Sequence, residues 1–343
     1  MNEKYRRKEM ENIVLNNLKK SQFFWNSVEK LSSFYSVDNF KRIPDEIIIE
    51  PTNSCNLRCP VCPTHFAMKR NRGFMDYDLF KSIIDEFKDK DKKPKISMNF
   101  SGEPLLNKDI GKFTRYANEN GHKTFISTNA TIMPYEMIKD LIESGLTSIH
   151  LCIDGISKES QEAYRVGSEF EEVKYNIESF IKIKKELGSS TPHISIQTLL
   201  TSFSEKEIDE IISWSESIGA DNVNLKSLSM GSYTTKEIKE KYNYLMPTDK
   251  KLQRKQSKIY KTVCTTPLRQ SLVYWNGDLG LCCVDFDNVI KLPNIKEKGY
   301  LNTLFSDEVV EKRKKGFQKQ FALCKKCSLG NADYMGINVD FRK

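Results

Sequence analysis

The sequence lacks long hydrophobic runs. No stretch of 18 or more consecutive apolar residues occurs in its 343 residues, so we expect no membrane-spanning helix and no membrane partner. The segment Met1–Lys20 is charged and has none of the apolar core that a secretory signal requires. These two absences favour a cytoplasmic protein. The chain also contains no internal repeat and no low-complexity segment.

A basic stripe interleaved with aromatic residues is missing as well. The net charge of +8 arises from 54 basic and 46 acidic residues, which is typical of a lysine-rich surface carrying charges of both signs. We therefore expect no nucleic-acid partner. A mildly basic surface would still attract an acidic electron-carrier protein.

Cysteine, in contrast, is plentiful for a cytoplasmic chain. Reducing compartments disfavour structural disulfides, so clustered cysteines there indicate metal or redox chemistry. Cys152 and Cys283 stand apart from the others in their spacing. The remaining seven have spacings typical of metal ligands, and they are Cys55, Cys59, Cys62, Cys264, Cys282, Cys324 and Cys327.

The hydrophobic pattern divides the chain into four predicted parts. Residues 1–44 are expected to form a charged helical lead-in, and residues 45–230 alternate short apolar runs with longer amphipathic stretches. Residues 231–259 are polar and are predicted to be a linker. Residues 260–343 are predicted to form a small cysteine-rich α+β domain, with a hairpin turn at Asn276-Gly277.

The second part is predicted to contain six β/α units. Glycines stand where helix C-caps belong, at Gly121, Gly145, Gly188 and Gly219. The predicted strands are Glu46–Glu50, Lys95–Phe100, Lys123–Ser127, Ser148–Ile153, His193–Leu200 and Asp221–Lys226. The predicted helices are Tyr77–Phe87, Ile110–Asn120, Tyr135–Ser144, Phe170–Leu187 and Lys206–Ile218. Strands alternating with helices favour an α/β fold with a parallel sheet, here a partial (β/α)6 barrel.

Three cysteines follow the first predicted strand in the pattern C-x3-C-x2-C, at Cys55, Cys59 and Cys62. Active sites of such barrels lie at the carboxyl ends of the strands, so the cysteines stand at the chemical end of the fold. Three thiolates on a [4Fe–4S] cluster would leave one iron open to a further ligand. A zinc site is the alternative, although zinc sites use four ligands and usually paired C-x2-C knuckles.

This motif, placed after a first strand, resembles the radical S-adenosylmethionine (radical SAM) superfamily over roughly residues 45–230. The resemblance implies a [4Fe–4S] cluster that binds S-adenosylmethionine (SAM) and cleaves it to methionine and a 5′-deoxyadenosyl radical. Val61 departs from the pattern, because relatives often carry an aromatic residue just before the third cysteine.

Later positions extend the resemblance. The segment Ser101-Gly102-Glu103-Pro104 is similar to the family's G-G-E-P loop, with Ser101 in place of the first glycine. The resemblance implies that Ser101, Gly102 and Glu103 contact the cofactor's ammonium group. Asn129 closes a segment that resembles the family's T-N-G element near the ribose or methionine.

Two further segments match family positions after the fourth predicted strand. Cys152 and Asp154 belong to a segment similar to S-x-D-G, in which Cys152 replaces the serine. Arg165 stands where relatives place an arginine on the cofactor carboxylate. Ordinary turns and a solvated arginine are the alternatives.

The C-terminal cysteines form a second group. Cys264 and Cys282 are separated by 17 residues, and Cys324 and Cys327 have C-x2-C spacing. Four cysteines ligate either a [4Fe–4S] cluster or a structural zinc ion. After a radical SAM barrel, the pattern resembles the Twitch form of the SPASM domain, which implies one auxiliary cluster and two [4Fe–4S] clusters in all. Cys283 competes with Cys282 as a ligand, and the alternation of side chains along the predicted hairpin favours Cys282.

The resemblance implies an enzyme that abstracts a hydrogen atom from its substrate. An auxiliary cluster that accepts an electron favours oxidation of a sugar- or aminocyclitol-like small molecule, with a peptide-modifying enzyme as the alternative. A flavodoxin- or ferredoxin-type reductant is expected. An iron–sulfur electron carrier or a metal-stabilised binding module is the non-enzyme alternative.

Substrate contacts are the least specific predictions. Gln197 and Lys226 are expected near the barrel mouth, and Asp285 and Asp287 are either near the substrate or simply solvated. No residue is identified from the sequence as a catalytic acid or base.

Overall fold

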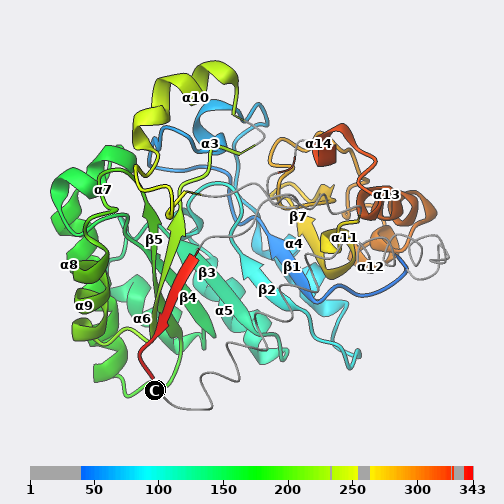
Figure 1. The fold of residues 1–343 in the computed structure, drawn as a ribbon. Coiled ribbons are helices and arrows are strands. Elements are labelled where there is room, and N and C mark those ends of the chain that lie inside the picture. Colours follow the sequence, from blue (N-terminus) through cyan, green and yellow to red (C-terminus); the bar gives the residue numbers. More distant parts are fainter. Residues whose placement is uncertain (1–39, 232–233, 254–262, 326, 328–335, 343) are drawn as a thin grey trace, which may run out of the picture.

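The structure, a computed structural model, describes residues 40–342 except 232–233, 254–262, 326 and 328–335. The six predicted β/α strands are present and parallel, which confirms the α/β class and the partial barrel (Figure 1). They are β1 (Glu46–Ile49), β2 (Lys95–Met98), β3 (Thr124–Thr128), β4 (Ser148–Cys152), β5 (His193–Leu200) and β6 (Asn222–Ser227). Most of the predicted helical lead-in, residues 1–39, lies outside the described residues.

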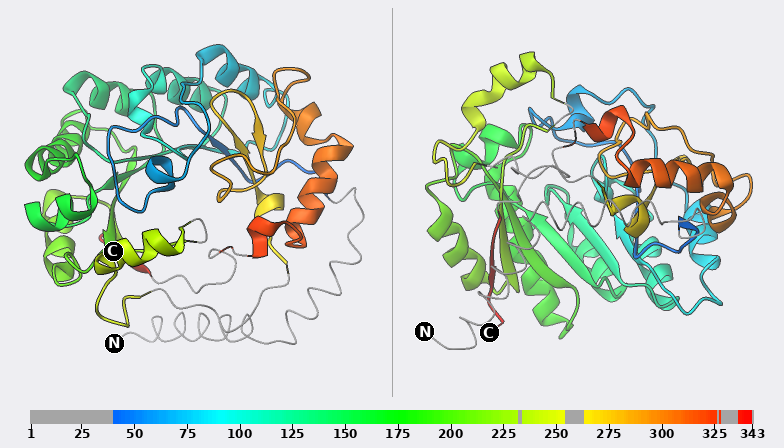
Figure 2. Two further views of the ribbon diagram at one scale, coloured as in Figure 1. Left: turned by 90° about the horizontal axis from the view of Figure 1, so that it is seen from above. Right: turned by 45° about the vertical axis from the view of Figure 1, so that its right-hand side comes forward.

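Helices follow the strands and cover the outer face of the sheet. Seen from above, they form an arc around it (Figure 2). The helices of this part are α3 (Pro63–Phe66), α4 (Tyr77–Asp85), η2 (Pro104–Leu106), α5 (Ile110–Glu119), α6 (Tyr135–Glu143), α7 (Lys158–Tyr164), α8 (Phe170–Glu186) and α9 (Ile208–Ile218). No helix within the described ranges is both long and apolar enough to cross a membrane.

Helix boundaries have local causes. The Asp76 side chain accepts from the Leu79 amide at 2.7 Å and starts α4, and Ser157 forms a capping box with Ser160 at the start of α7. The glycines predicted as C-caps all have positive φ, including +88° at Gly219, where a residue with a Cβ would be strained.

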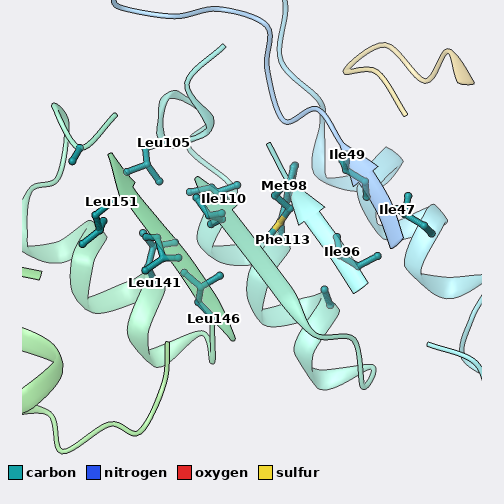
Figure 3. Close-up of a cluster of buried hydrophobic side chains, with 14 of the residues drawn as sticks. Ile47, Ile49, Ile96, Met98, Leu105, Ile110, Phe113, Leu141, Leu146 and Leu151 are labelled. Carbon is teal, nitrogen blue, oxygen red and sulfur yellow. The ribbon is translucent and has the colours of Figure 1, made fainter. Parts of the chain in front are cut away.

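The core lies between the sheet and the outer helices (Figure 3). Alternate residues of each strand point outward, such as Ile47 and Ile49 of β1, while the helices contribute the side chains that meet them. Phe80 and Phe113 are fully buried and stack with their ring centroids 4.3 Å apart. This one-sided packing leaves the opposite face of the sheet free to carry polar side chains.

The C-terminal segment adds strands to both edges of this sheet. The predicted hairpin forms from β7 (Gln270–Val273) and β8 (Leu279–Gly280), and β7 pairs parallel with β1. A strand that the sequence did not suggest, β9 (Gly336–Asp340), pairs antiparallel with β6. The helices of this segment are α11 (Thr266–Arg269), α12 (Tyr300–Leu304), α13 (Asp307–Phe317) and α14 (Ala322–Lys325). The sheet order is β8-β7-β1-β2-β3-β4-β5-β6-β9.

The predicted linker contains α10 (Lys236–Tyr242) and η3 (Asn243–Leu245), and its residues 232–233 and 254–259 lie outside the described ones. Leu245 is fully buried and packs with Leu57, Val61 and Tyr164. This part of the chain therefore covers the cysteine loop rather than only joining two domains. The boundaries of the four predicted parts remain predictions.

The edge position of β9 leads to a prediction. Ending the chain after residue 335 removes β9 and leaves the backbone groups on one side of β6 without partners. Amides of β6 that bond to β9 should then exchange with solvent at least about tenfold faster in hydrogen–deuterium exchange. Amides of β1 and β2 serve as the internal control, and an unchanged β6 would contradict the pairing.

Candidate active site

The first cysteine cluster lies on the loop that leaves β1. Cys59 is buried and Cys55 and Cys62 are half-buried. The loop is held by local bonds: the Cys62 amide donates to Cys59 O at 3.1 Å, and the Leu57 amide donates to Cys55 Sγ at 3.5 Å. Among the described residues, no three His, Cys, Asp or Glu side chains are grouped so as to hold a single metal ion.

The electrostatics of this loop suit a cationic centre. Burial raises the pKa of the Cys59 thiol to about 12, and the charge of Arg165 opposes that rise. Burial also raises the pKa of Cys55. A thiolate is favoured here only when positive charge lies beside it, and bound iron would supply that charge. Three soft sulfur ligands on one short loop fit an iron–sulfur cluster in kind and number.

The predicted loop at residues 101–104 packs directly against the cysteine loop. The Glu103 amide donates to Ser54 O at 2.8 Å. Gly102 has φ +79°, and a Cβ at this position would stand 2.5 Å from Ser54 O. Only glycine permits this close approach of two backbones. Ser101 is buried, and its hydroxyl bonds to Glu50.

Glu103 joins the ends of β2 and β3. Its carboxylate accepts from Thr128 Oγ1 at 2.7 Å, from the Asn129 amide at 2.8 Å and from the Leu105 amide at 3.1 Å. The side chain is buried, which raises the pKa of Glu103, while these donors act in the opposite direction. The result is a fixed carboxylate of the kind that receives an ammonium group.

The Asn129 side chain is engaged within the protein. Its Nδ2 donates to Asn56 Oδ1 at 3.0 Å, and its Oδ1 accepts from Thr131 Oγ1 at 2.6 Å. Asn56 lies between Cys55 and Cys59, so Asn129 ties the end of β3 to the cysteine loop. Its predicted contact with the cofactor stays a prediction.

Asp154 and Arg165 form a buried ion pair at the end of β4. The Arg165 Nε donates to Asp154, whose other oxygen accepts from the Leu199 amide at 2.8 Å. Burial opposes the charge on Arg165, but Asp154 together with Cys59 and Cys152 raises the pKa of Arg165 above its usual range. The charge of Arg165 also acts on Cys55, Cys59, Cys152 and Glu103. The predicted site residues from β2, β4 and the cysteine loop are therefore neighbours.

Polar side chains continue from this point across the inner face of the sheet. Cys152 Sγ lies 3.5 Å from both Ser127 Oγ and Gln197 Nε2, and Lys226 Nζ donates to Gln197 Oε1. Burial lowers the pKa of Lys226, and burial together with the charge of Lys226 lowers the pKa of His150 to about 4. His150 had no signal in the sequence, since it is one of four scattered histidines.

The C-terminal cysteines also come together. Cys283 is within electrostatic range of Cys264 and Cys327, and Cys324 is within range of Cys282, Cys264 and Cys327. Five thiols thus share one region, which fits the four ligands of an auxiliary cluster. β8 ends at Gly280, so the strand alternation invoked for Cys282 does not reach it. Cys282 and Cys283 are hydrogen-bonded to each other, and that bond and burial raise the pKa of Cys282.

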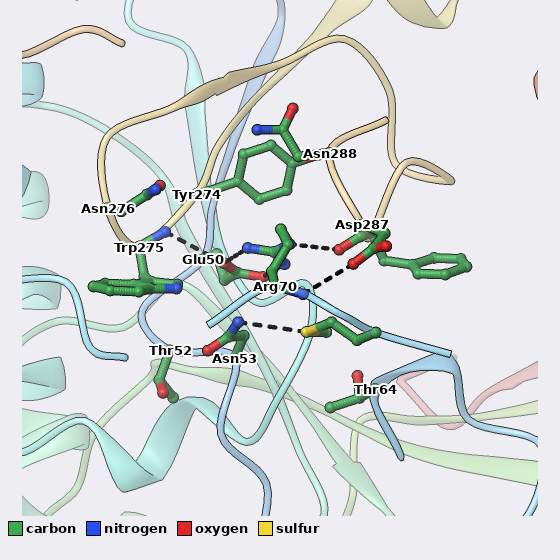
Figure 4. A network of polar contacts seen from close by, with 12 residues as sticks. Glu50, Thr52, Asn53, Thr64, Arg70, Tyr274, Trp275, Asn276, Asp287 and Asn288 are labelled. Atoms are coloured by element: carbon green, nitrogen blue, oxygen red, sulfur yellow. Dashed lines mark hydrogen bonds and ion pairs between the residues drawn. The ribbon is translucent and has the colours of Figure 1, made fainter. Parts of the chain in front are cut away.

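A network of polar contacts connects the two cysteine regions (Figure 4). Glu50, fully buried, receives two bonds from the Arg70 guanidinium, at 2.7 and 3.0 Å. Arg70 lies 4.3 Å from the centroid of the Tyr274 ring and donates from Nε to Phe286 O at 2.7 Å. The segment after the first cluster is thereby attached to the hairpin that leads to Cys282.

The two aspartates expected near the substrate or in solvent are engaged elsewhere. Asp287 accepts from the amides of Lys69 and Arg70 at 2.7 and 3.1 Å. Asp285 is buried and accepts from the amides of Val289 and Ile290 at 2.6 and 2.9 Å. Both carboxylates therefore hold backbone segments in place by accepting hydrogen bonds from amides. The sequence alone does not show which amides an acidic loop residue will bind.

Family models match both parts of the chain. The model of the Radical SAM superfamily matches residues 49–215, and the SPASM model, an iron–sulfur cluster-binding domain, matches residues 264–328. Together the two matched ranges cover more than half of the chain.

Curated relatives are similar over part of their length. The tungsten-containing aldehyde ferredoxin oxidoreductase cofactor-modifying protein of Pyrococcus furiosus is 29% identical over 53% of this chain and 51% of its own. The PqqA peptide cyclase of Rhodopseudomonas palustris is 29% identical over 36% of this chain and 32% of its own. The S-adenosyl-L-methionine-dependent 2-deoxy-scyllo-inosamine dehydrogenase of Niallia circulans is 29% identical over 29% of this chain and 41% of its own. The chain thus spans about half or less of the length of these relatives.

Solved structures share the fold. BtrN in complex with AdoMet and 2-DOIA superposes with a TM-score of 0.52 at 19% identity, covering 83% of this chain and 93% of that one. Streptococcus suis SuiB bound to the precursor peptide SuiA superposes with a TM-score of 0.61 at 18% identity, covering 84% of this chain and 70% of that one.

The matched domains imply SAM and [4Fe–4S] clusters as cofactors, an auxiliary cluster among them. They also exclude the reading of the chain as a simple electron carrier or binding module, because the superfamily consists of enzymes. The chain belongs to the radical SAM superfamily and carries a SPASM iron–sulfur domain in its C-terminal part.

Proposed function

We propose that this enzyme binds SAM at the carboxyl ends of β1–β4 and uses it to oxidise a small polar alcohol held on the inner face of the sheet. The observation that carries the proposal is the convergence of the cysteine loop, Glu103 and Arg165 on one place. A [4Fe–4S] cluster on Cys55, Cys59 and Cys62 would supply the electron that splits SAM into methionine and a 5′-deoxyadenosyl radical.

The protein's own residues bind and orient the methionine part of SAM in this proposal. The buried Glu103 carboxylate receives the ammonium group, and Arg165 binds the carboxylate through nitrogens other than the Nε that donates to Asp154. Asp154 is a positioning residue in this proposal, because its two carboxylate oxygens bond to Arg165 Nε and to the Leu199 amide. Gly102 allows Glu103 to approach the cysteine loop.

An apolar layer over the cysteine loop excludes water from the radical. This layer is a buried cluster in which Leu228 and Leu245, both after β6 in the chain, pack with Leu57, Val61 and Tyr164. A radical that removes hydrogen from carbon reacts with whatever lies nearest, so a closed site protects the reaction.

The substrate is proposed to lie against the row that runs from Cys152 through Gln197 to Lys226. Oxidation of CH–OH to C=O removes one hydrogen atom, then one electron and one proton. Lys226 accepts the proton, and its lowered pKa makes the neutral amine more accessible. An auxiliary cluster on Cys264, Cys282, Cys324 and Cys327 would accept the electron. The similarity to the Niallia circulans dehydrogenase supports a sugar- or aminocyclitol-like substrate.

A peptide substrate is the second candidate. It is supported by the similarity to the PqqA peptide cyclase and by the shared fold with SuiB bound to its precursor peptide. The polar row on the inner face favours the small molecule, because Gln197 and Lys226 offer hydrogen bonds to hydroxyl groups. Mass spectrometry of aminocyclitols, sugars and peptides after incubation with the reduced enzyme and SAM would decide between them.

The SAM site leads to a prediction on two variants. Cys59→Ala should abolish conversion of SAM to 5′-deoxyadenosine, because the cluster loses a ligand. Glu103→Gln should weaken SAM binding by about 10- to 100-fold in anaerobic titration calorimetry, since a hydrogen bond to a charged group contributes roughly 1.5–3 kcal/mol. Glu86→Gln is the matched control, because Glu86 only accepts from the amides of Tyr300 and Leu301. Undiminished cleavage by Cys59→Ala would refute the assignment.

The auxiliary cysteines lead to a second prediction. Two clusters imply about eight irons per chain, and replacing Cys264, Cys282, Cys324 and Cys327 by Ala should leave about four. That variant should still produce 5′-deoxyadenosine, because the first cluster lies on a separate loop, yet release no oxidised product. A wild-type protein with about four irons and one zinc would show that the second site is structural.

Lys226 leads to a third prediction. Lys226→Met should lower oxidised product formed per 5′-deoxyadenosine by about 100-fold, a typical contribution of a general base. Liquid chromatography with mass spectrometry measures both products in one sample. Lys184→Met is the control, since Lys184 pairs with Asp221 at the other end of the strands. An unchanged ratio would remove Lys226 from the mechanism.

A further inference from the structure

The cysteine loop and the segment after it carry charge of one sign. Between Glu50 and Asp76 the sequence contains no acidic residue, while Arg58, Lys69, Arg70 and Arg72 are basic. The chain as a whole mixes 54 basic with 46 acidic residues. The segment that holds the proposed cluster ligands is therefore distinct in charge from the average of the chain.

Most of this charge is exposed and uncompensated. Arg70 is paired with Glu50, but Arg58, Lys69 and Arg72 are exposed, as is His65. We call these four residues the basic loop face. Among the described residues, no carboxylate lies within ion-pair distance of the charged groups of these four side chains, and Asp287 bonds to the backbone amide of Lys69 instead.

The side chains of this face bond to neutral groups, which leaves their charge intact. Arg58 donates to the carbonyls of Cys55 and Leu57, each at 2.9 Å, and Arg72 donates to the carbonyls of Asn53 and Thr64. The outer helices differ, because their lysines pair along the helix, as Lys139 does with Glu143 and Lys182 with Glu186.

Three of the four residues of the basic loop face line a pocket that also reaches a proposed cluster ligand. A pocket of about 350 Å³ is lined by Arg58, His65 and Arg72 together with Cys55. Ser54, Leu57 and Thr64 complete its wall. A protein seated over this pocket would bring its own surface close to Cys55.

The face is also held in place before any partner arrives. Asp287 accepts from the backbone amides of Lys69 and Arg70, and Arg72 joins the two limbs of the loop through Asn53 and Thr64. A surface that is already ordered loses less conformational entropy on association.

We propose that the basic loop face is the docking site of an acidic electron-carrier protein, which passes one electron to the cluster held by Cys55, Cys59 and Cys62. The proposal rests on the proposed function, since it needs a cluster at those cysteines. The carrier's cofactor is oxidised by one electron and the cluster is reduced by one, with no bond made or broken. Opposite charges on the two faces accelerate encounter and orient the carrier.

Charge reversal tests the docking site. His65→Glu/Lys69→Glu, which changes two exposed side chains that make no hydrogen bond to the cysteine loop among the described residues, is compared with Lys139→Glu/Lys182→Glu, which reverses two lysines on the outer helices. The holoenzymes are titrated with an oxidised flavodoxin and an oxidised ferredoxin, both of net negative charge, by calorimetry at low and high salt. We expect the dissociation constant for the carrier to rise at least about tenfold in the loop variant alone, with a weaker dependence on salt.

A second measurement separates docking from the state of the cluster. Dithionite is a small reductant that needs no docking site, so the loop variant should keep the dithionite-reduced electron paramagnetic resonance signal of the wild type and its dithionite-driven cleavage of SAM. Cleavage driven by the reduced carrier should fall at least about tenfold. Because the Lys69 side chain is exposed, Lys69→Glu alone serves as the milder variant and should show a smaller loss in the same direction.

The outcomes are distinct. Equal affinity of both double variants for the carriers, or no binding of either carrier by the wild type, would overturn the docking site. Absence of 5′-deoxyadenosine from the wild type under dithionite would overturn the proposed function instead, whatever the binding experiment gives.

Discussion

The buried ion pair between Glu50 and Arg70 is the interaction on which the arrangement of the site depends. A carboxylate with no exposed surface is costly unless a cation and hydrogen bonds compensate it. Arg70 meets that need with two bonds, and it reaches Glu50 only because the chain folds back after the cysteine loop. The same guanidinium stacks on Tyr274, so one pair fixes the end of β1, the loop and the C-terminal hairpin together.

Parallel strands supply the rest of the site. Their carboxyl ends meet at one edge of the sheet, where Glu103, Asn129 and Asp154 follow β2, β3 and β4. Each of these side chains bonds to a neighbouring strand or loop, as Glu103 does to Thr128 and Asp154 to Leu199. The polar groups are thus oriented by one another. Arg165 pairs with Asp154, and its positive charge also acts on Glu103.

The sequence predicted the elements with strong local signals. β5 begins and ends where it was expected, and the helix-ending glycines have the backbone conformation that glycine favours. Features that depend on distant contacts could not be predicted. The five residues of β9 are mostly exposed, so this strand has no buried face. Leu245 is buried because it packs against the cysteine loop at Leu57, a contact between distant parts of the chain. The preference for Cys282 over Cys283 stays a prediction, because β8 ends at Gly280 and the alternation of side chains along a strand does not reach either cysteine.

The positions of β7 and β9 have a consequence for how the protein is made. The strands from β1 to β6 emerge from the ribosome first, but the partners of both sheet edges follow residue 269. During synthesis the half-barrel therefore has two open edges. Tyr274, whose ring contacts Arg70 in the complete protein, is made only after residue 269. The cysteine loop is thus complete in the nascent chain before the strands that close the two edges of its sheet have been made.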